Sequence, residues 1–216
     1  MNALAVLTCV ATLGISGCAG VSKIDFTRLG RDGWQRPDEV TRALDIQPGD
    51  RVADLGAGEG YFVPHLLEAV GPMGQVYAVD VDPEITEDLY ARFAGSPGNV
   101  DVVLGRYEDP GLPDGKIDLI LIVNTYHHIE DRPAYFQRLQ ADLSERGRIA
   151  ILEPNGELTG VLTLFLDDGH TSRASEVGAE MRAAGYRPTS SFDFLATQIF
   201  EVFEPAHTSV SARDVP

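Results

Sequence analysis

The sequence predicts an α/β protein built on a doubly wound, mainly parallel seven-stranded sheet with an antiparallel edge strand. Three observations support this fold class. Short apolar segments alternate with amphipathic ones along residues 34–204, a glycine-rich turn follows the first apolar segment, and two expected strands follow each other at the end. Alternating strands and helices imply parallel strands joined by crossover helices, and a closing strand pair implies an antiparallel edge.

Hydrophobic spacing and helix breakers define the elements in order. A first helix begins at Pro37 and ends before Pro48-Gly49. Strands are expected at 51–55, 75–81, 100–104, 117–123 and 148–152, and helices at 61–70, 83–93, 132–143 and 175–184. Residues 187–204 are expected to form two strands joined by a turn. Near-continuous apolar strands are typical of a parallel sheet with helices on both faces, a Rossmann-like arrangement.

The chain is acidic. Its 216 residues include 33 Asp and Glu against 17 Lys and Arg, which gives a formal net charge of −16. A field of this sign repels phosphate backbones, so nucleic acid is a poor candidate for the substrate. The hydrophobic share of 44% is ordinary for a globular domain with a sizeable core.

The N-terminal segment differs from the rest of the chain. Residues 3–15 form an uncharged apolar run that is too short for a membrane span but suits the core of a signal peptide. The ending Ile15-Ser16-Gly17-Cys18 resembles a bacterial lipobox, in which the cysteine is lipidated and the preceding segment is removed. Cys9 and Cys18 are the only cysteines, so the expected mature domain would have no thiol except the lipidated one, and neither a disulfide nor cysteine catalysis is expected there.

These features predict the organisation of the chain. We expect a signal peptide at 1–17, a tether at 18–33, the domain at 34–204 and a tail at 205–216, with the protein held on a membrane of the cell envelope through Cys18. No Lys or Arg precedes the apolar run. A misassigned start codon, a buried N-terminal helix and a cytoplasmic location therefore remain alternatives.

A glycine-rich loop follows the first expected strand. Asp54, Gly56, Gly58 and Gly60 form the pattern D-x-G-x-G-x-G. Glycines let the backbone turn tightly and bring a ligand close to amides at a helix N-terminus. The spacing differs from the G-x-G-x-x-G pattern that accommodates a dinucleotide pyrophosphate. A plain tight turn explains a lone glycine loop equally well, whereas the complete string 52–62 is more specific.

An acid ends the second expected strand. Asp80 lies 20 residues beyond Gly60, where a carboxylate can accept hydrogen bonds from both hydroxyls of a ribose. The alternative is that Asp80 caps the helix beginning at Pro83, for which Asp82 is better placed. We therefore favour a ribose-binding role for Asp80.

Polar residues are grouped directly after the apolar strand 117–123, and they include Asn124, His127 and His128. Histidine titrates near neutrality and can take a proton from a reacting group. Alternatively, at least one of the two histidines caps or packs, and the sequence does not say which. A metal site formed with His170 is disfavoured because no ligand spacing supports it, so no metal is expected.

These motifs together resemble those of the class I S-adenosylmethionine-dependent methyltransferases, and among them the small-molecule type 11/type 25 group. The resemblance covers residues 34–204 and is strongest over 34–82. The segment Trp34–Val40 is similar to one that lies over the cofactor in that group.

The resemblance implies S-adenosylmethionine as the cofactor and assigns roles by motif. Asp54 and Gly56 would hold the methionine part, Gly58 and Gly60 would permit its close approach, and Asp80 would bind the ribose.

Three further roles follow from the same resemblance. Glu108, after the third strand, would meet the adenine edge, Asn124 would lie near the methionine end, and His127 or His128 would lie near the methyl acceptor. Two departures from the group are clear. Glu59 replaces the usual threonine or serine of the loop, and the variable segment around Val161–Phe165 either lines an apolar pocket or extends the core.

The implied reaction is in-line displacement that transfers a methyl group to an oxygen, nitrogen or carbon atom of a small-molecule acceptor. A base is needed only where that acceptor must lose a proton. Two other functions remain: a non-enzymatic S-adenosylmethionine-binding lipoprotein that acts as a sensor or scaffold, and an NAD-dependent dehydrogenase, which the loop spacing disfavours. The acceptor and the oligomeric state stay open.

Overall fold

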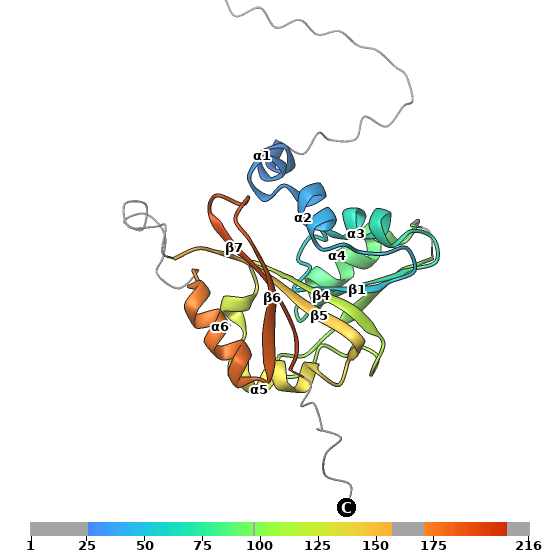
Figure 1. Cartoon of the computed structure of the whole chain (residues 1–216). Coiled ribbons are helices and arrows are strands. Elements are labelled where there is room, and N and C mark those ends of the chain that lie inside the picture. The colour runs from blue at the N-terminus through green and yellow to red at the C-terminus, as the bar shows by residue number, and fades with distance from the viewer. Residues whose placement is uncertain (1–25, 97, 157–170, 207–216) are drawn as a thin grey trace, which may run out of the picture.

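The computed structural model describes residues 26–96, 98–156 and 171–206 of the chain. A seven-stranded sheet in the order β3-β2-β1-β4-β5-β7-β6 forms its centre (Figure 1). The strands are β1 Arg51–Leu55, β2 Gln75–Asp80, β3 Val100–Leu104, β4 Ile117–Val123, β5 Leu143–Pro154, β6 Tyr186–Phe192 and β7 Gln198–Pro205.

This sheet confirms the predicted fold class. The pairs β1–β2, β1–β4, β2–β3 and β4–β5 are parallel, and β7 is antiparallel to both of its neighbours, β5 and β6. The antiparallel strand β7 therefore lies between β5 and β6. The turn after β6 reverses the chain, so that β7 pairs with β5 on one side and with β6 on the other.

The helices are α1 Phe26–Gln35, α2 Pro37–Ala43, α3 Val63–Val70, α4 Pro83–Phe93, α5 Arg132–Leu139 and α6 Ala174–Ala183, with a short 3₁₀ turn, η1, at Tyr126–His128. Asp82 caps α4 as expected, since its side chain accepts hydrogen bonds from the backbone N–H groups of Glu84 and Ile85.

Two segments differ from the sequence-based expectation. Residues 26–33, expected to be part of a tether, lie in α1. The contacts of Arg31 and Asp32 with Tyr61 offset the low helix propensity of Gly30 and Gly33. The helix expected over 132–143 ends at Leu139, because the carbonyls of residues 141 and 142 accept hydrogen bonds from the turn before β4 and residue 143 already pairs with Ile117.

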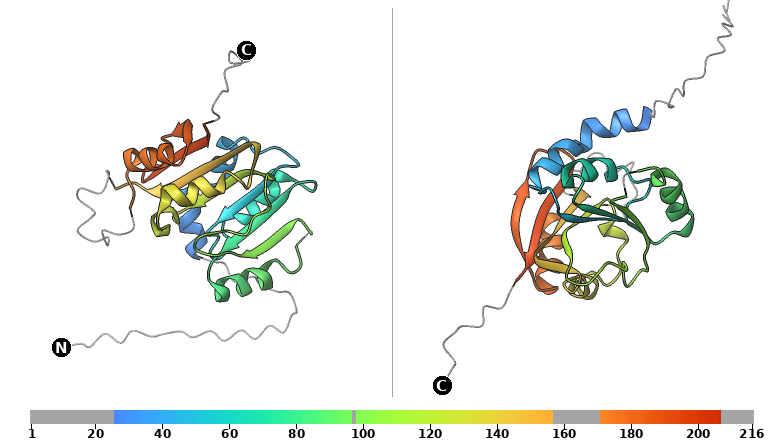
Figure 2. Two further views of the ribbon diagram at one scale, coloured as in Figure 1. Left: turned by 90° about the horizontal axis from the view of Figure 1, so that it is seen from below. Right: turned by 90° about the vertical axis from the view of Figure 1, so that its right-hand side faces the viewer.

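Helices lie on both faces of the sheet (Figure 2), and apolar side chains fill the layers between the helices and the sheet. One core cluster joins the sheet to α2, α3 and α4, and the other joins it to α5 and α6. The spacing of Val63, Leu66 and Val70 places all three on the buried face of α3. Among the described residues, no helix is long and apolar enough to cross a membrane.

Strand order determines where polar loops meet. β1 has β2 on one side and β4 on the other, all parallel, so the loops after Leu55, Asp80 and Val123 emerge at the same edge. Successive strands are added on one side of β1 for β2 and β3 and on its other side for β4 and β5, and this switch in strand order creates a crevice at the carboxyl ends of the strands. The three motifs found in the sequence therefore converge at this edge.

Candidate cofactor site

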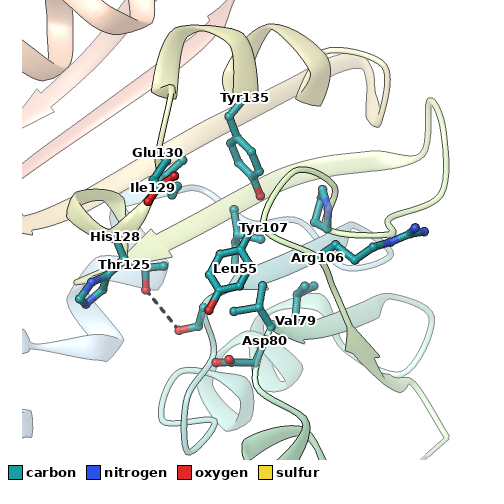
Figure 3. Close-up of a pocket in the computed structure, with 13 residues that line it drawn as sticks. Leu55, Val79, Asp80, Arg106, Tyr107, Thr125, His128, Ile129, Glu130 and Tyr135 are labelled. Carbon is teal, nitrogen blue, oxygen red and sulfur yellow. Dashed lines mark hydrogen bonds between the residues drawn. The ribbon is translucent and has the colours of Figure 1, made fainter.

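A cavity of about 360 Å³ lies at this edge of the sheet (Figure 3). Its walls come from the ends of β1, β2 and β4, the loop after β3, the η1 turn and α5, and they include Leu55, Gly56, Val79, Asp80, Val81, Arg106, Tyr107, Thr125, His128, Ile129 and Tyr135. Most of these side chains are apolar or aromatic. A mainly apolar cavity with a few polar groups suits a flat, partly polar small molecule.

Asp80 and Glu130 are the two acids that line this cavity, and Asp80 lies at the opposite end from Tyr135 in Figure 3. Its Oδ2 accepts a hydrogen bond from the backbone N–H of Gly58 (3.0 Å) and its Oδ1 accepts one from the N–H of Asp82 (3.1 Å). These two bonds fix the carboxylate and leave lone pairs on both oxygens. Asp80 can therefore accept further hydrogen bonds from a pair of ligand hydroxyls.

Gly56 of the glycine loop lines the cavity, and Gly58 lies beside it through its hydrogen bond to Asp80. Both residues have positive φ values, 77° and 52°. A Cβ on Gly56 would lie 2.3 Å from Cγ2 of Thr125, whereas a Cβ on Gly58 would project into open space. Gly56 thus permits close packing against the β4 loop, and Gly58 leaves room for a ligand beside its backbone.

Gly60 has a different role from the one expected. A Cβ at this position would lie 2.8 Å from the Phe93 ring and 2.9 Å from Leu89, both on α4. The structure therefore explains Gly60 by helix packing, and the residue does not line the cavity.

Asp54 ends β1 just before the loop and is only 3% exposed. Burial raises the pKa of its carboxyl to about 7, with the positive charge of Arg31 opposing this rise and the negative charge of Asp80 adding to it. A buried carboxylate at this position favours a cationic ligand, because a positive charge would offset the cost of ionising it.

The helix α1 lies against the end of this loop. The guanidinium of Arg31 is stacked over the Tyr61 ring at 4.0 Å from its centroid, and the Tyr61 hydroxyl is hydrogen-bonded to Asp32. Arg31 Nε also donates to Oε1 of Gln35, which is fully buried. The helix thus contacts the loop through Arg31 and Asp32, which precede the segment Trp34–Val40 that was expected to lie over the cofactor.

The loop after β4 is fixed by residues from distant strands. Asn124 has a left-handed backbone, with φ of 52°, and its Oδ1 accepts a hydrogen bond from Nε2 of Gln198 on β7 (2.8 Å). The hydroxyl of Thr125 lies 3.4 Å from the Gly56 carbonyl, which is the dashed line in Figure 3. Asn124 therefore lies beside the cavity without lining it.

The two histidines have separate environments, although their ring centroids are only 4.0 Å apart. His128 lines the cavity. The side chain of His127 is 8% exposed, and its Nδ1 lies 2.7 Å from Oε2 of Glu153 on β5. Glu153 is fully buried and also accepts a hydrogen bond from the N–H of Tyr126 (2.7 Å). Burial raises the pKa of Glu153, and its hydrogen bond with His127 partly opposes that rise.

Glu108 is not brought to the cavity. It borders a separate cavity of about 240 Å³ together with Asp109 and Arg138, and its carbonyl accepts a hydrogen bond from Arg138. The tight turn between Arg106 and Asp109, closed by two backbone hydrogen bonds, directs Arg106 and Tyr107 toward the main cavity instead. His170 and Val161–Phe165 lie outside the described residues.

Several site residues escaped sequence reasoning. Arg31 was missed because residues 19–33 lack an obvious apolar periodicity, whereas Gln35 belongs to the segment 34–40 that the resemblance placed over the cofactor. Glu153 could have been identified from the sequence, because a single acid directly after the apolar run 149–152 is unusual in a buried strand. In the described ranges, no group of three or more His, Cys, Asp or Glu side chains is arranged to hold a metal ion.

Comparisons with known proteins agree with this geometry. Residues 52–147 match the family model described as "Methyltransferase domain". The chain is 50% identical to a protein-L-isoaspartate O-methyltransferase of Aeropyrum pernix over 78 residues, which are 34% of this chain and 29% of that protein. It is 29% identical to the ubiquinone/menaquinone biosynthesis C-methyltransferase UbiE of Psychromonas ingrahamii over 124 residues, 56% of this chain and 49% of that protein.

The fold has relatives among solved structures. A SAM-dependent methyltransferase from Aquifex aeolicus superposes with a TM-score of 0.72 at 22% identity, covering 81% of this chain and 92% of that one. The chain spans less than two thirds of the length of the curated relatives it matches. The protein therefore has the fold of the class I methyltransferases, and its residues 52–147 match their domain family.

Proposed function

We propose that this protein is an S-adenosylmethionine-dependent methyltransferase that acts on a small-molecule acceptor. The observation that carries the proposal is the position of Asp80. Its carboxylate is fixed by the Gly58 amide and lines the same cavity as Gly56, so an acid suited to a ribose lies beside a loop open to a ligand. The match of residues 52–147 to a methyltransferase domain supports the same conclusion.

The residues present fit this cofactor. Apolar walls such as Leu55, Val79 and Tyr135 suit an adenine ring, and Asp80 suits the ribose hydroxyls. Open space beside Gly58 accommodates the chain that joins the ribose to the amino acid. The buried carboxyl of Asp54 suits the positive end of the molecule.

S-adenosylmethionine supplies an electrophilic methyl group on a sulfonium, and its transfer to a nucleophile leaves S-adenosylhomocysteine. The protein contributes mainly by holding the donor and the acceptor in line. His128 lines the cavity, and His127 is held by Glu153, so both are candidates to take a proton from an acceptor that must lose one.

The acceptor is a separate question. The matched relatives carry names that refer to different acceptors, a protein isoaspartate in one case and a quinone precursor pathway in the other. The domain match ends at residue 147, before the segment that follows β5. A net charge of −16 argues against a nucleic-acid acceptor. The relatives named for ubiquinone/menaquinone biosynthesis and for aklanonic acid support a small-molecule acceptor.

Calorimetry with the full-length chain tests the proposal. We expect S-adenosylhomocysteine and S-adenosylmethionine to bind and NAD not to bind. Binding of NAD alone would overturn the proposal and favour a dehydrogenase. If the cofactor binds but no component of a cell extract gains a labelled methyl group, the protein is better explained as a non-enzymatic sensor or scaffold.

We also propose that Cys18 is lipidated and holds the protein on a membrane of the cell envelope. The support is the Ile15–Cys18 motif after an uncharged apolar run. Both lie outside the described residues. Detergent partitioning of the wild-type protein tests this location.

A further inference from the structure

A second cavity, of about 240 Å³, shares a wall with the cofactor cavity. Pro110 and Tyr135 line both cavities, whereas Asp80 and Gly56 line only the first. The remaining lining of the second cavity comes from the loop between β3 and β4, from α5 and from the residue just before β5. Methyl transfer as proposed above makes no use of this cavity.

The polar side chains of the second cavity are mostly negative. Four are acids and one is basic: Glu108, Asp109, Asp114, Asp142 and Arg138. Arg138 donates from Nε to the carbonyl oxygen of Glu108 (3.3 Å), and in the described part of the chain it forms no ion pair with a carboxylate. A low-dielectric cavity with an excess of one sign of charge concentrates ions of the other sign. This space, called the acidic cavity below, therefore favours cations.

Asp142 is the buried acid of the group. The residue is 9% exposed, and no donor among the described residues is hydrogen-bonded to its carboxylate. Burial raises the pKa of this carboxyl to about 6, and the negative charges of Asp109 and Asp114 add to the rise. A buried polar group without a partner is costly, so a carboxylate in this state that borders a cavity indicates a ligand that supplies the missing donor.

Asp118, at the start of β4, provides a contrast. Its Oδ2 accepts a hydrogen bond from the N–H of Arg51 (2.9 Å), and its Oδ1 accepts one from the hydroxyl of Ser144 (2.8 Å). Both oxygens of that carboxylate are therefore satisfied by protein donors. Asp142 precedes Ser144 by two residues, yet it has no such donor within the described ranges. The structural role that fits Asp118 does not explain Asp142.

The chemistry of the acidic cavity selects among cations. Across the described ranges, no three acidic side chains are arranged as metal ligands. An ammonium nitrogen requires no such arrangement, because it carries three N–H donors on one atom and a single carboxylate can bind it. Tyr135 and Leu139 add apolar surface that suits a short hydrocarbon chain. Asp109, fixed by a hydrogen bond from the N–H of Gly111 (2.8 Å), supplies a second negative charge.

From these contacts we propose that the acidic cavity binds a small aliphatic diamine in its protonated form, with Asp142 as the partner of one ammonium group. Asp109 and Asp114 border the same cavity and favour the second ammonium group. The site goes beyond the proposed function, because it lies beside the cofactor cavity and does not depend on methyl transfer. It accounts for the excess of acids and for the lack of a hydrogen bond to Asp142 within the described residues.

Calorimetry on the full-length chain at low ionic strength and about pH 8 tests the site, because Asp142 is then ionised and an alkylamine is still protonated. The probe is 1,4-diaminobutane, which should bind as a single molecule per chain. The monoamine 1-aminobutane should bind more weakly because it has one charge, and the uncharged 1,4-butanediol should not bind. Asp142→Asn should weaken the diamine by roughly tenfold to a hundredfold, the effect of losing one charged hydrogen bond.

Matched variants make the result specific. Glu87→Gln removes the same charge from an exposed position on α4, outside the cavity, and should not change the affinity for the diamine. Asp80→Ala alters the cofactor cavity and should not change it either. Asn has nearly the shape of Asp, and thermal unfolding shows whether Asp142→Asn is folded. If it is not, Asp114→Asn at an exposed position replaces it and should also weaken the diamine.

Four results would overturn the inference. The first is a wild-type protein that does not bind the diamine. The second is equal weakening by Glu87→Gln and Asp142→Asn, which assigns binding to the overall negative charge. The third is displacement of the diamine by an equal concentration of Mg²⁺, which makes the acids a metal site. The fourth is equal weakening by Asp80→Ala and Asp142→Asn, which places the amine in the cofactor cavity. Failure of the proposed function is distinct, since S-adenosylhomocysteine then does not bind while the diamine still does.

Discussion

Oε2 of Glu153 lies 2.7 Å from Nδ1 of His127, which joins the end of β5 to the turn after β4. The same carboxylate accepts the N–H of Tyr126 (2.7 Å), so a single buried side chain holds two consecutive residues of η1. A second carboxylate, that of Glu180 on α6, bonds the Tyr126 hydroxyl and pairs with Arg132. The wall of the cavity that carries His128 is therefore held in place by acids from two other elements.

Replacing Glu153 with Gln tests this arrangement. The amide has one carbonyl oxygen for two donors, so one buried hydrogen bond is lost and the free energy of unfolding should fall by roughly 1–3 kcal/mol. Denaturant unfolding measures the change. Glu145→Gln, at an exposed position of the same strand, is the matched control and should have no effect. Equal stability of Glu153→Gln and wild type would show that Glu153 does not hold the turn.

Asp54 should make cofactor affinity depend on pH. Its pKa is raised to about 7 by burial, and a cationic ligand prefers the ionised carboxylate. As pH rises through 7 the carboxylate ionises and affinity should increase, while below that pH it should fall by about tenfold per pH unit. Calorimetry between pH 6 and 8 measures the slope. Asp54→Asn should bind the cofactor more weakly, and its affinity should no longer depend on pH in this range. If the affinity of the variant keeps the full pH dependence, that dependence belongs to another group.

The same raised pKa affects stability with a defined sign. The unfolded carboxyl releases its proton near its ordinary value of 3.8, whereas the folded one keeps its proton until about pH 7. The folded state therefore binds more protons in this window, and the free energy of unfolding should fall as pH rises from about 4 to 7. Denaturant unfolding across that range should show that the free energy of unfolding falls less with rising pH in Asp54→Asn than in wild type. An identical fall in both proteins would contradict the assigned pKa.

Asp80 and Asp82 provide a matched pair of acids. Asp80→Ala should weaken S-adenosylhomocysteine by roughly 1–3 kcal/mol, because the ribose hydroxyls lose a buried partner. Asp82→Ala removes the cap of α4 and should lower stability by about 1 kcal/mol with little effect on affinity. Calorimetry and thermal unfolding distinguish the two effects. If Asp82→Ala weakened binding as much as Asp80→Ala, the ribose role would no longer be specific to Asp80.

Alanine at the two loop glycines should separate folding from binding. A Cβ at Gly56 collides with Thr125 at 2.3 Å in a backbone with positive φ, so Gly56→Ala should lower stability by more than the roughly 1–3 kcal/mol of backbone strain alone. A Cβ at Gly58 meets open space, so Gly58→Ala should cost only about 1–2 kcal/mol of stability but should weaken the cofactor. Melting temperatures and calorimetry measure both. Unchanged affinity in Gly58→Ala would mean that no ligand passes close to this residue.

Cys18 can be tested by phase separation. Wild-type protein expressed in a bacterial host should enter the detergent phase, and Cys18→Ser should move it to the aqueous phase because the acyl anchor is lost. Cys9→Ser lies in the same segment and should remain in the detergent phase. Recovery of wild-type protein in the aqueous phase would show that the motif is not a lipobox.

The sequence predicted much of the fold because the signals were local. Apolar strands such as 117–123 and breakers such as Gly71-Pro72 follow from side-chain and backbone preferences that act within a few residues. The glycine loop and Asp80 were found in the same way, since their spacing along the chain is the motif itself. The cap at Asp82 also followed from its position just before Pro83, and the structure confirms it.

Residues that act through distant partners were not predictable in this way. Glu108 and Tyr107 are neighbours in sequence, and only the turn closed by Arg106 and Asp109 decides which of them faces the cavity. Sequence spacing alone could not separate His127 from His128, because the separation depends on an acid 26 residues away.

Local sequence signals were enough to predict the order of strands and helices from Pro37 onward, the glycine loop and the acid suited to a ribose. Tertiary structure alone decided that α1 reaches the loop through Arg31, that Glu153 holds His127 and that Gly60 packs against α4. The reason is physical. Local conformational preferences depend on adjacent residues, whereas burial arises only when distant segments pack together. Burial raises the pKa of Asp54, and it leaves Nε2 of Gln35 without a partner among the described residues.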